Sequence, residues 1–365
     1  MKVNALIDKK KTLVFFLLQG LFMVSYGQND QSTVVAKGSQ INLQERSYAD
    51  WENKGTAIQE KLTSEDTFSL GKGAVVQAPT DHSKIATPSD GTFSGVPNNG
   101  TMKIDMKVGY NLVGNPYPSG INVHDFIDSN TTITGTIYFL KKTNATSNTD
   151  VSSYATLTKT AYVSNDSKGE DASMGYFKTG DEPNWFINMA QGFFVDATSD
   201  SKLLFTNRMR RITRVDPNFK NSQIDTAKKK GMYWLNLTNE AGAYSQMAVG
   251  YSSEGTIAED QGIDGRNINL DFYLASLIVG NDYAIQGRAA FTSADMVSLS
   301  YKVESSGNYS ITIDHVAGIF KDNSQTIYIW DKVKNKVHNL NTGAYSFFSK
   351  VGAFEERFQI VYEPR

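Results

Sequence analysis

The chain has 365 residues, of which 40% are hydrophobic and 12% aromatic, so it can bury a core and is long enough for two domains of ordinary size. Its formal net charge of -2 gives no general attraction to nucleic acid or to anionic membranes. Because there is no cysteine, disulfides, thiolate metal sites and cysteine nucleophiles are excluded.

The first 27 residues have the pattern of an export signal. A basic stretch, Lys9 to Lys11, precedes a mostly apolar run from Leu13 to Val24, and Ser25 and Gly27 supply small residues before a cut at Gln28. We therefore expect residues 1–27 to be a signal peptide, with a buried N-terminal helix as the alternative. No later run is long enough to span a membrane.

After residue 30 the apolar residues alternate along many short segments. Residues 28–64 are polar and weakly patterned, whereas bursts such as "GTIYFL", "GFFV" and "QTIYIW" lie between turn-forming residues. This predicts an all-β fold with two consecutive antiparallel β-sandwich domains of Ig-like or jelly-roll-like type. The expected domains are residues 65–214 and 232–365, joined by the polar linker 215–231.

Two features of the first sandwich bear on function. The prolines of "GNPYPSGI" must end the strand through Leu112 and Val113, which predicts a structural corner with Tyr117 packed back onto the sandwich. The alternative is a ligand platform built on Tyr110 and Tyr117. Residues 141–182 are rich in polar residues and predict a long surface loop or hairpin, a common location for binding sites.

Sequence patterns typical of catalysis are absent. The histidines, at 82, 124, 315 and 338, do not pair at metal-ligand spacing, and there is no GxSxG, P-loop or GxGxxG pattern. Ser199 with Lys202 matches SxxK, but the KTG at 178–180 precedes it instead of following it. We therefore expect no enzyme activity and no cofactor.

Two charged segments are candidate binding sites. The loop "EDQGIDGRNINLD" offers Asp260 and Asp264 as weak calcium ligands, but it lacks EF-hand spacing, and Asp264-Gly265 is also a plain turn signal. The basic run from Arg208 to Arg214 has no interleaved aromatic residues, so a solvated strand end is favoured over nucleic-acid binding.

The order of several motifs carries a family resemblance. "GAVVQAPT", "GTFSGVPNNGTMKI", "GYNLVGNPYPSGINVHDFI" and "AQGFFVDA" resemble a module of large secreted proteins from gliding Gram-negative bacteria. "MYWLNLTNEAGAYSQMAVGYSSEGT", "DMVSLSYKVESSGNYSITIDHVAGIF" and "GAFEERFQIVYEPR" resemble the type C sorting domain of the type IX secretion system. The resemblance covers about residues 70–365, although the segment after Gly250 is a looser version of the family pattern.

This resemblance implies export to the periplasm and then passage across the outer membrane by the type IX machinery, giving a cell-surface or extracellular protein. The final strands would carry recognition, and an exposed terminal strand could add to a partner's sheet edge. The residues expected to carry it are Tyr345, Phe347, Gly352, Phe354, Arg357, Phe358, Ile360 and Tyr362.

The alternative function is an adhesin that binds a surface glycan through residues 65–214, with the C-terminal domain serving only delivery. Flat aromatic rings stack on sugars, so the candidate ligand residues are Trp51, Tyr162, Tyr176 and Trp185. A core role is an equally supported alternative for Trp185.

Overall fold

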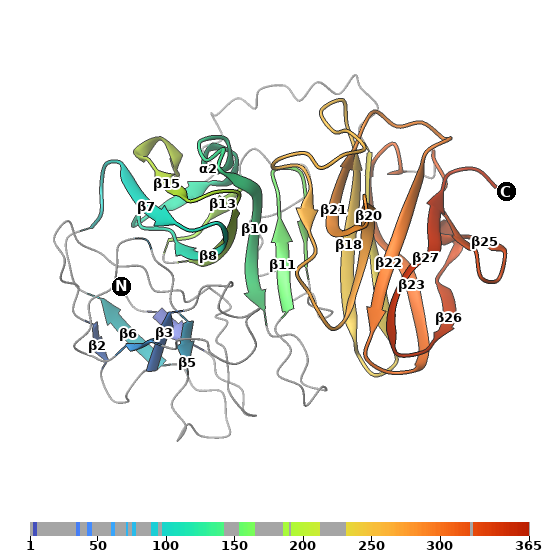
Figure 1. Cartoon of the computed structure of the whole chain (residues 1–365), viewed down its shortest axis with the longest axis horizontal. Helices are drawn as coiled ribbons and strands as arrows, with labels where there is room; N and C mark the ends of the chain where they lie inside the picture. Colours follow the sequence, from blue (N-terminus) through green and yellow to red (C-terminus); the bar gives the residue numbers. More distant parts are fainter. Residues whose placement is uncertain are drawn as a thin grey trace. The chain divides into compact units, whose positions relative to one another are not determined.

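Figure 1 shows a computed structural model of the chain. The structure describes residues 97–141, 153–164, 185–189, 191–211, 231–321 and 324–364, and before them Gly71 and six short strands. Several predicted features lie outside the described residues: residues 215–230 of the linker, the signal peptide apart from residues 3–5, Trp51, His82, Tyr176 and Arg214. The last linker residue, Gly231, begins a described strand.

The chain divides into two compact units. The first consists of Met1–Lys142 and Ala172–Val215, and the second of Thr143–Asp171 and Asp216–Arg365. The division after Val215 falls at the start of the predicted linker. The segment Thr143–Asp171 belongs to the second unit, although the sequence pattern had placed it inside the first sandwich.

Six short strands of the first unit form two small sheets. In one, β6 lies between β1 and β2, and in the other β3 lies between β4 and β5. Their bounds are Val3–Ala5 for β1, Val34–Ala36 for β2, Asn42–Glu45 for β3, Glu60–Leu62 for β4, Val75–Gln77 for β5 and Ser89–Phe93 for β6.

The remaining strands of the first unit surround an aromatic core. Strands β8, β14 and β10 pair in that order, β7 pairs with β15, and β9 lies between β13 and β16. Phe126, Phe193 and Phe205 meet with ring centroids 5.3 to 5.5 Å apart. The strands are β7 Met102–Met106, β8 Gly109–Gly114, β9 Gly120–Asn122, β10 Ile133–Lys141, β13 Phe186–Ile187, β14 Gly192–Ala197, β15 Ser201–Phe205 and β16 Arg210–Arg211.

The described part of the first unit contains one α-helix, α2 (Val123–Asp128), and one 3-10 helix, η3 (Asn207–Met209). The Asn122 side chain caps α2 by accepting a hydrogen bond from the Asp125 amide at 2.9 Å. The sequence pattern had indicated no helix here, because six residues are too few to show helical periodicity.

The corner predicted at "GNPYPSGI" is confirmed. Strand β8 ends at Gly114, and Tyr117 is fully buried, donating its hydroxyl to the Gly100 carbonyl at 2.6 Å. The guanidinium of Arg210 lies 5.2 Å from the Tyr117 ring centroid. With its hydroxyl and ring both engaged in the fold, Tyr117 does not form the ligand platform considered as the alternative.

The second unit is built on one large sheet whose strand order is β25-β24-β27-β22-β20-β21-β18-β17-β23-β26, with β19 paired to β21 (Figure 1). All pairings are antiparallel except the parallel pair β18 and β21. The strands are β17 Gly231–Asn239, β18 Tyr244–Tyr251, β19 Gly265–Arg266, β20 Tyr273–Ile278, β21 Asn281–Arg288, β22 Met296–Val303, β23 Gly307–Gly318, β24 Tyr328–Asp331, β25 Lys336–Asn339, β26 Tyr345–Ser349 and β27 Gly352–Val361.

The two ends of this sheet are close along the chain, since the short 3-10 helix η5 (Leu340–Thr342) joins β25 to β26. The sheet is therefore nearly closed on itself around one core. Residues that alternate in the sequence, such as Tyr233, Leu235 and Leu237 of β17, line that core, as the period-2 pattern predicted. The all-β class is confirmed.

A β-hairpin from the segment predicted as a surface loop or hairpin completes the second unit. Strands β11 (Ser153–Leu157) and β12 (Tyr162–Val163) pair through Thr156 with Val163 and Leu157 with Tyr162. Tyr154 to Thr158 are buried, as are Ala161 and Val163. A hairpin was one of the two forms predicted for residues 141–182, but the expected surface position was wrong for residues 153–164, because most of them are buried.

Candidate functional site

The C-terminal strand β27 is the candidate site, and it is an interior strand. It pairs with β22 along Gly352 to Val361 and with β24 along Phe358 to Val361. The expectation that the terminal strand offers an open edge to a partner was wrong for its second half, because both backbone edges are already hydrogen-bonded.

A bulge interrupts β27 in its middle. Leu299 of β22 lies opposite Phe358, whereas the next residue, Ser300, lies opposite Glu355. Two residues of β27, Glu356 and Arg357, are thus extra, and Glu356 has a left-handed backbone with φ of 62°. In an unbroken strand Arg357 and its neighbour Phe358 would point to opposite faces, and the bulge redirects Arg357.

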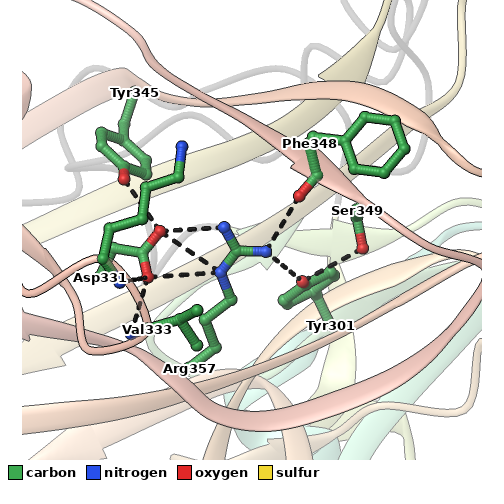
Figure 2. A network of polar contacts seen from close by, with 8 residues as sticks. Tyr301, Asp331, Val333, Tyr345, Phe348, Ser349 and Arg357 are labelled. Atoms are coloured by element: carbon green, nitrogen blue, oxygen red, sulfur yellow. Dashed lines mark hydrogen bonds and ion pairs between the residues drawn. The ribbon is translucent and has the colours of Figure 1, made fainter.

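Arg357 forms a buried ion pair with Asp331, which is the centre of the network in Figure 2. The Arg357 Nη2 atom lies 2.9 Å from Oδ2 of Asp331, and their side chains are 12% and 0% exposed. The same carboxylate accepts hydrogen bonds from the Tyr345 hydroxyl at 2.9 Å and from the backbone amides of Val333 and Lys334. Every oxygen of the buried charge is therefore satisfied.

The charge state of Asp331 follows from these contacts. Burial raises its pKa, but the hydrogen bonds from Arg357 and Tyr345 outweigh burial and leave the pKa of the Asp331 carboxyl below its usual value. The pair is accordingly charged at neutral pH.

The network also connects the two ends of the sheet. Arg357 Nη1 donates to the Phe348 carbonyl at 3.1 Å and to the Tyr301 hydroxyl at 3.2 Å (Figure 2). Its guanidinium lies 4.8 Å from the ring centroids of Phe347 and Phe358. Since β24 and β27 lie near one end of the sheet and β26 at the other, Arg357 and Asp331 together join them where no backbone pairing does.

The other end of β27 is held by a chain of hydroxyl groups. The Tyr362 hydroxyl lies 2.9 Å from that of Tyr233 and 2.6 Å from that of Tyr251, which donates to Asp295 at 2.8 Å. Asp295 pairs with Arg288 through two bonds of 2.6 Å. Burial raises the pKa of Tyr362 well above its ordinary value, so the hydroxyl stays neutral.

The predicted recognition residues are brought together, but mostly inside the protein. Tyr345, Phe347, Phe358, Ile360 and Tyr362 all belong to the core of the second unit. Gly352, Phe354 and Arg357 are half-buried. Their side chains shape and stabilise the domain, and five of the eight present no surface to a partner.

Sequence reasoning missed the partners of these residues. Asp331, Tyr301, Tyr251 and Asp295 complete the two networks at the ends of β27. Asp331 could have been noticed, because it is the acid that ends the apolar segment "TIYIWDK" beside a predicted strand. Its pairing with Arg357 depends on the strand order, which the pattern does not contain.

Exposed apolar side chains lie next to the Arg357 network. Phe348 is 56% exposed and Val351 is 60% exposed, at the end of β26 and in the turn before β27. Val333, whose amide is bonded to Asp331, is 75% exposed. We call these three residues the closing-end patch.

The two weak calcium candidates lie in a loop that backbone groups already organise. Asp264 accepts hydrogen bonds at 2.6 Å from the amides of Gly287 and Asp260, and Asp260 accepts one at 2.6 Å from the amide of Thr256. Burial raises the pKa of Asp264 to about 7. Among the described residues no group of three or more acidic or histidine side chains could hold a metal ion. Calcium binding by Asp260 and Asp264 stays a prediction.

The other candidates lie apart from β27 in the sequence. Trp185 is buried, which favours its core role over sugar stacking, and Tyr162 is half-buried in the hairpin. Lys202 of the SxxK match forms an ion pair with Asp105. His338 contacts the Gly343 carbonyl, in keeping with a structural role.

The basic run is also engaged in the first unit. Arg211 forms an ion pair with Asp125, and Arg210 donates to Ser119 and Asn99. These contacts support a structural role for this part of the run. No helix in the described part of the chain is long and apolar enough to cross a membrane.

A comparison with known protein families assigns the chain to one of them. Residues 26–362 match a family described as a domain of unknown function (DUF8693), and the chain belongs to that family. The match spans both units. No curated protein and no solved structure matches the chain.

Proposed function

We propose that this chain is an exported, non-catalytic cell-surface or extracellular protein whose C-terminal sandwich is a sorting domain for the type IX secretion machinery. One observation carries the proposal. The motifs that resemble a type C sorting domain form β17, β18, β22, β23 and β27, which contribute to one continuous core. These segments follow the order of the motifs in the family pattern, and they also share one hydrophobic core. They therefore form one folding unit.

The export signal at residues 1–27 is part of the proposal. The family match begins at residue 26, next to the expected cut before Gln28, which agrees with a mature chain that starts there. The general secretion route would deliver that mature chain to the periplasm, and the outer-membrane machinery would be its next partner.

The contact surface for the machinery follows from the position of β27. The second half of β27 is paired on both edges and cannot add to a partner's sheet without unfolding its own, so we assign recognition to the outer surface of the folded domain. The closing-end patch is the surface we assign to it, because Phe348 and Val333 are exposed apolar residues whose backbone groups bond to Arg357 and Asp331, and Val351 is exposed in the turn that follows β26.

The test compares the location of the full chain in cells with and without an active type IX machinery. The proposal expects the protein at the surface or in the medium in the first case and retained in the periplasm in the second. Equal surface delivery in both strains would refute it.

A second arm tests the closing-end patch. Phe348→Ser combined with Val351→Ser is expected to lower surface delivery while leaving the melting temperature nearly unchanged. The control is Val279→Ser with Ile257→Ser, which removes two apolar side chains elsewhere that are even more exposed. Deletion of residues 340–365 is a poor substitute, since it removes two strands of the sheet.

The glycan-binding alternative for residues 65–214 stays a prediction. Of its four candidate aromatics, Trp185 is buried in the core and Tyr162 belongs to the hairpin of the second unit. A glycan array probed with the full chain and with Trp185→Phe would test it, and the burial of Trp185 predicts that this substitution leaves any binding unchanged.

A further inference from the structure

The hairpin of β11 and β12 is held on the second unit largely through its backbone. Asn269 contacts both backbone groups of Tyr154, accepting from its amide at 2.7 Å and donating to its carbonyl at 3.3 Å. A side-chain amide that pairs with both groups of one residue recognises an extended backbone and is indifferent to the side chain there.

The second strand of the hairpin is also held by side chains that bond to its backbone groups. Trp234 donates its indole N–H to the Tyr162 carbonyl at 2.9 Å, and the Ser164 amide donates to Oε1 of Gln246 at 3.0 Å. These contacts lie on either side of Val163. The hairpin turn adds a hydrogen bond from the Lys159 amide to the Gly262 carbonyl at 2.9 Å.

Between the two backbone contacts a small apolar site receives the side chain of Val163. Val163 and Ala161 pack against Trp234, Ala248 and Ile285, with Met232 and Ala317 at the margin. This cluster is separate from the main core of the second unit. The size of these residues favours a small or β-branched side chain at the centre of the bound segment.

The side chains that grip the hairpin are held in place by other residues of the second unit. Trp234 stacks on His315 with ring centroids 3.9 Å apart and an interplanar angle of 16°. Gln246 donates to Asn236, which in turn donates to Asp314 at 2.9 Å. Since none of these supporting residues belongs to the hairpin, the receptor is organised before the hairpin docks.

We propose that the outer face formed by β17, β18 and the Asn267–Asn269 segment is a receptor for an extended peptide, and that its occupant is the chain's own residues 153–164. Recognition rests on backbone hydrogen bonds with one small apolar side chain as anchor, which is how strand-like peptides are commonly bound. Because the contacts are to the backbone, the same segment fits whether it comes from its own chain or is supplied separately. This proposal is independent of the export proposal.

The test displaces the hairpin and supplies it again in trans. In the full chain, Val163→Asp places a charge in the apolar site and is expected to expel the hairpin. A fluorescently labelled peptide of residues 153–164, SYATLTKTAYVS, is then added, and binding is followed by anisotropy. The matched control is Lys159→Ala, which leaves Val163 and Ala161 in place.

The proposal expects the peptide to bind the Val163→Asp protein and to bind the native and Lys159→Ala proteins at least tenfold more weakly, because their sites are occupied. A peptide carrying Val163→Asp is expected to bind at least tenfold more weakly as well. No binding to a folded Val163→Asp protein would overturn the proposal, and so would equal binding of the two peptides.

Hydrogen exchange on the native full chain gives a test that needs no variant. The amides of Tyr154 and Ser164 are expected to exchange through local opening, well before the amides of Leu235 and Leu237 in β17. Exchange of all four amides in one global event would show that the hairpin is an inseparable part of the core and would contradict the proposal. If Val163→Asp fails to fold, Ala161→Asp replaces it.

Discussion

The terminal strand β27 and the hairpin strand β12 both belong to the second unit, but different chemical groups hold them. Strand β27 is anchored by side chains, with Arg357 paired to Asp331 at one end and Tyr362 in a hydroxyl chain at the other. Strand β12 is anchored by its backbone, through Tyr162 and Ser164. Side-chain anchors inside a core fix one sequence in one place, whereas backbone anchors on an outer face permit exchange of the segment.

The difference bears directly on how the protein can be recognised. A strand whose side chains complete the core cannot leave without unfolding the domain. A hairpin that covers a small separate cluster can leave while the main core persists.

Arg357→Ala is expected to have the largest effect on stability. It leaves the fully buried Asp331 carboxylate without its cation and removes the connection from β27 to β26. Breaking a buried ion pair on one side typically costs about 3 kcal/mol. Urea denaturation of the full chain measures this loss.

The control for Arg357→Ala is Lys107→Ala, which removes an ion pair with Asp200 at the surface. Little change is expected there, since exposed pairs contribute little. Equal destabilisation by the two substitutions would show that the Arg357 network does not hold the sheet together.

The next effect is a dependence of stability on pH. The pKa of Asp264 is raised by burial to about 7 in the folded chain from an ordinary value of 3.8. A raised carboxyl pKa contributes stability that is complete below about 4 and is lost as pH rises through about 7. Denaturation curves between pH 4 and 8 should show this loss for the native chain.

Asp264→Asn identifies the group responsible. The variant protein has no titrating carboxyl at position 264. Its free energy of unfolding should therefore vary less with pH across the same interval than that of the native chain, even if its absolute stability is lower. An unchanged pH dependence in Asp264→Asn would assign the titration to another group. Asp264 also bonds to Gly287 and adjoins the carbonyls that receive the hairpin, so the hairpin should loosen over the same interval.

Tyr362→Phe should have a moderate effect. It removes the hydroxyl that links Tyr233 and Tyr251 but keeps the ring that packs against Phe291, 5.0 Å away. Loss of a buried hydrogen bond typically costs about 1 kcal/mol, and two are involved. Thermal unfolding should show a loss clearly smaller than that of Arg357→Ala.

The smallest effect is expected in the hairpin. Thr156 is fully buried, and its hydroxyl has no partner within the described part of the chain. Thr156→Val keeps the shape and removes an unsatisfied polar group, so the hairpin should gain about 1 kcal/mol of docking stability. In the peptide assay the Thr156→Val peptide should bind several-fold more tightly, and weaker binding would contradict the assigned packing.

The amino-acid sequence alone determined the all-β class and the faces of individual strands. Phe358, Ile360 and Tyr362 alternate along the sequence, which is the pattern of one buried face, and all three are buried. This succeeds because a two-residue period is a property of any strand, whatever its neighbours are. The corner at Tyr117 was predictable for a similar reason, since proline limits the backbone locally.

Only the tertiary structure decided which strands are neighbours. Strand β27 lies between β22 and β24, which places the last strand of the chain inside the sheet. The bulge at Glu356 and Arg357 then turns a charged side chain towards Asp331, 26 residues earlier. Likewise, the polar stretch around Tyr162 became a docked hairpin because Trp234 and Gln246 supply the partners for its backbone. Such pairings depend on contacts between residues that are distant in the sequence. The local pattern of a segment therefore cannot predict them.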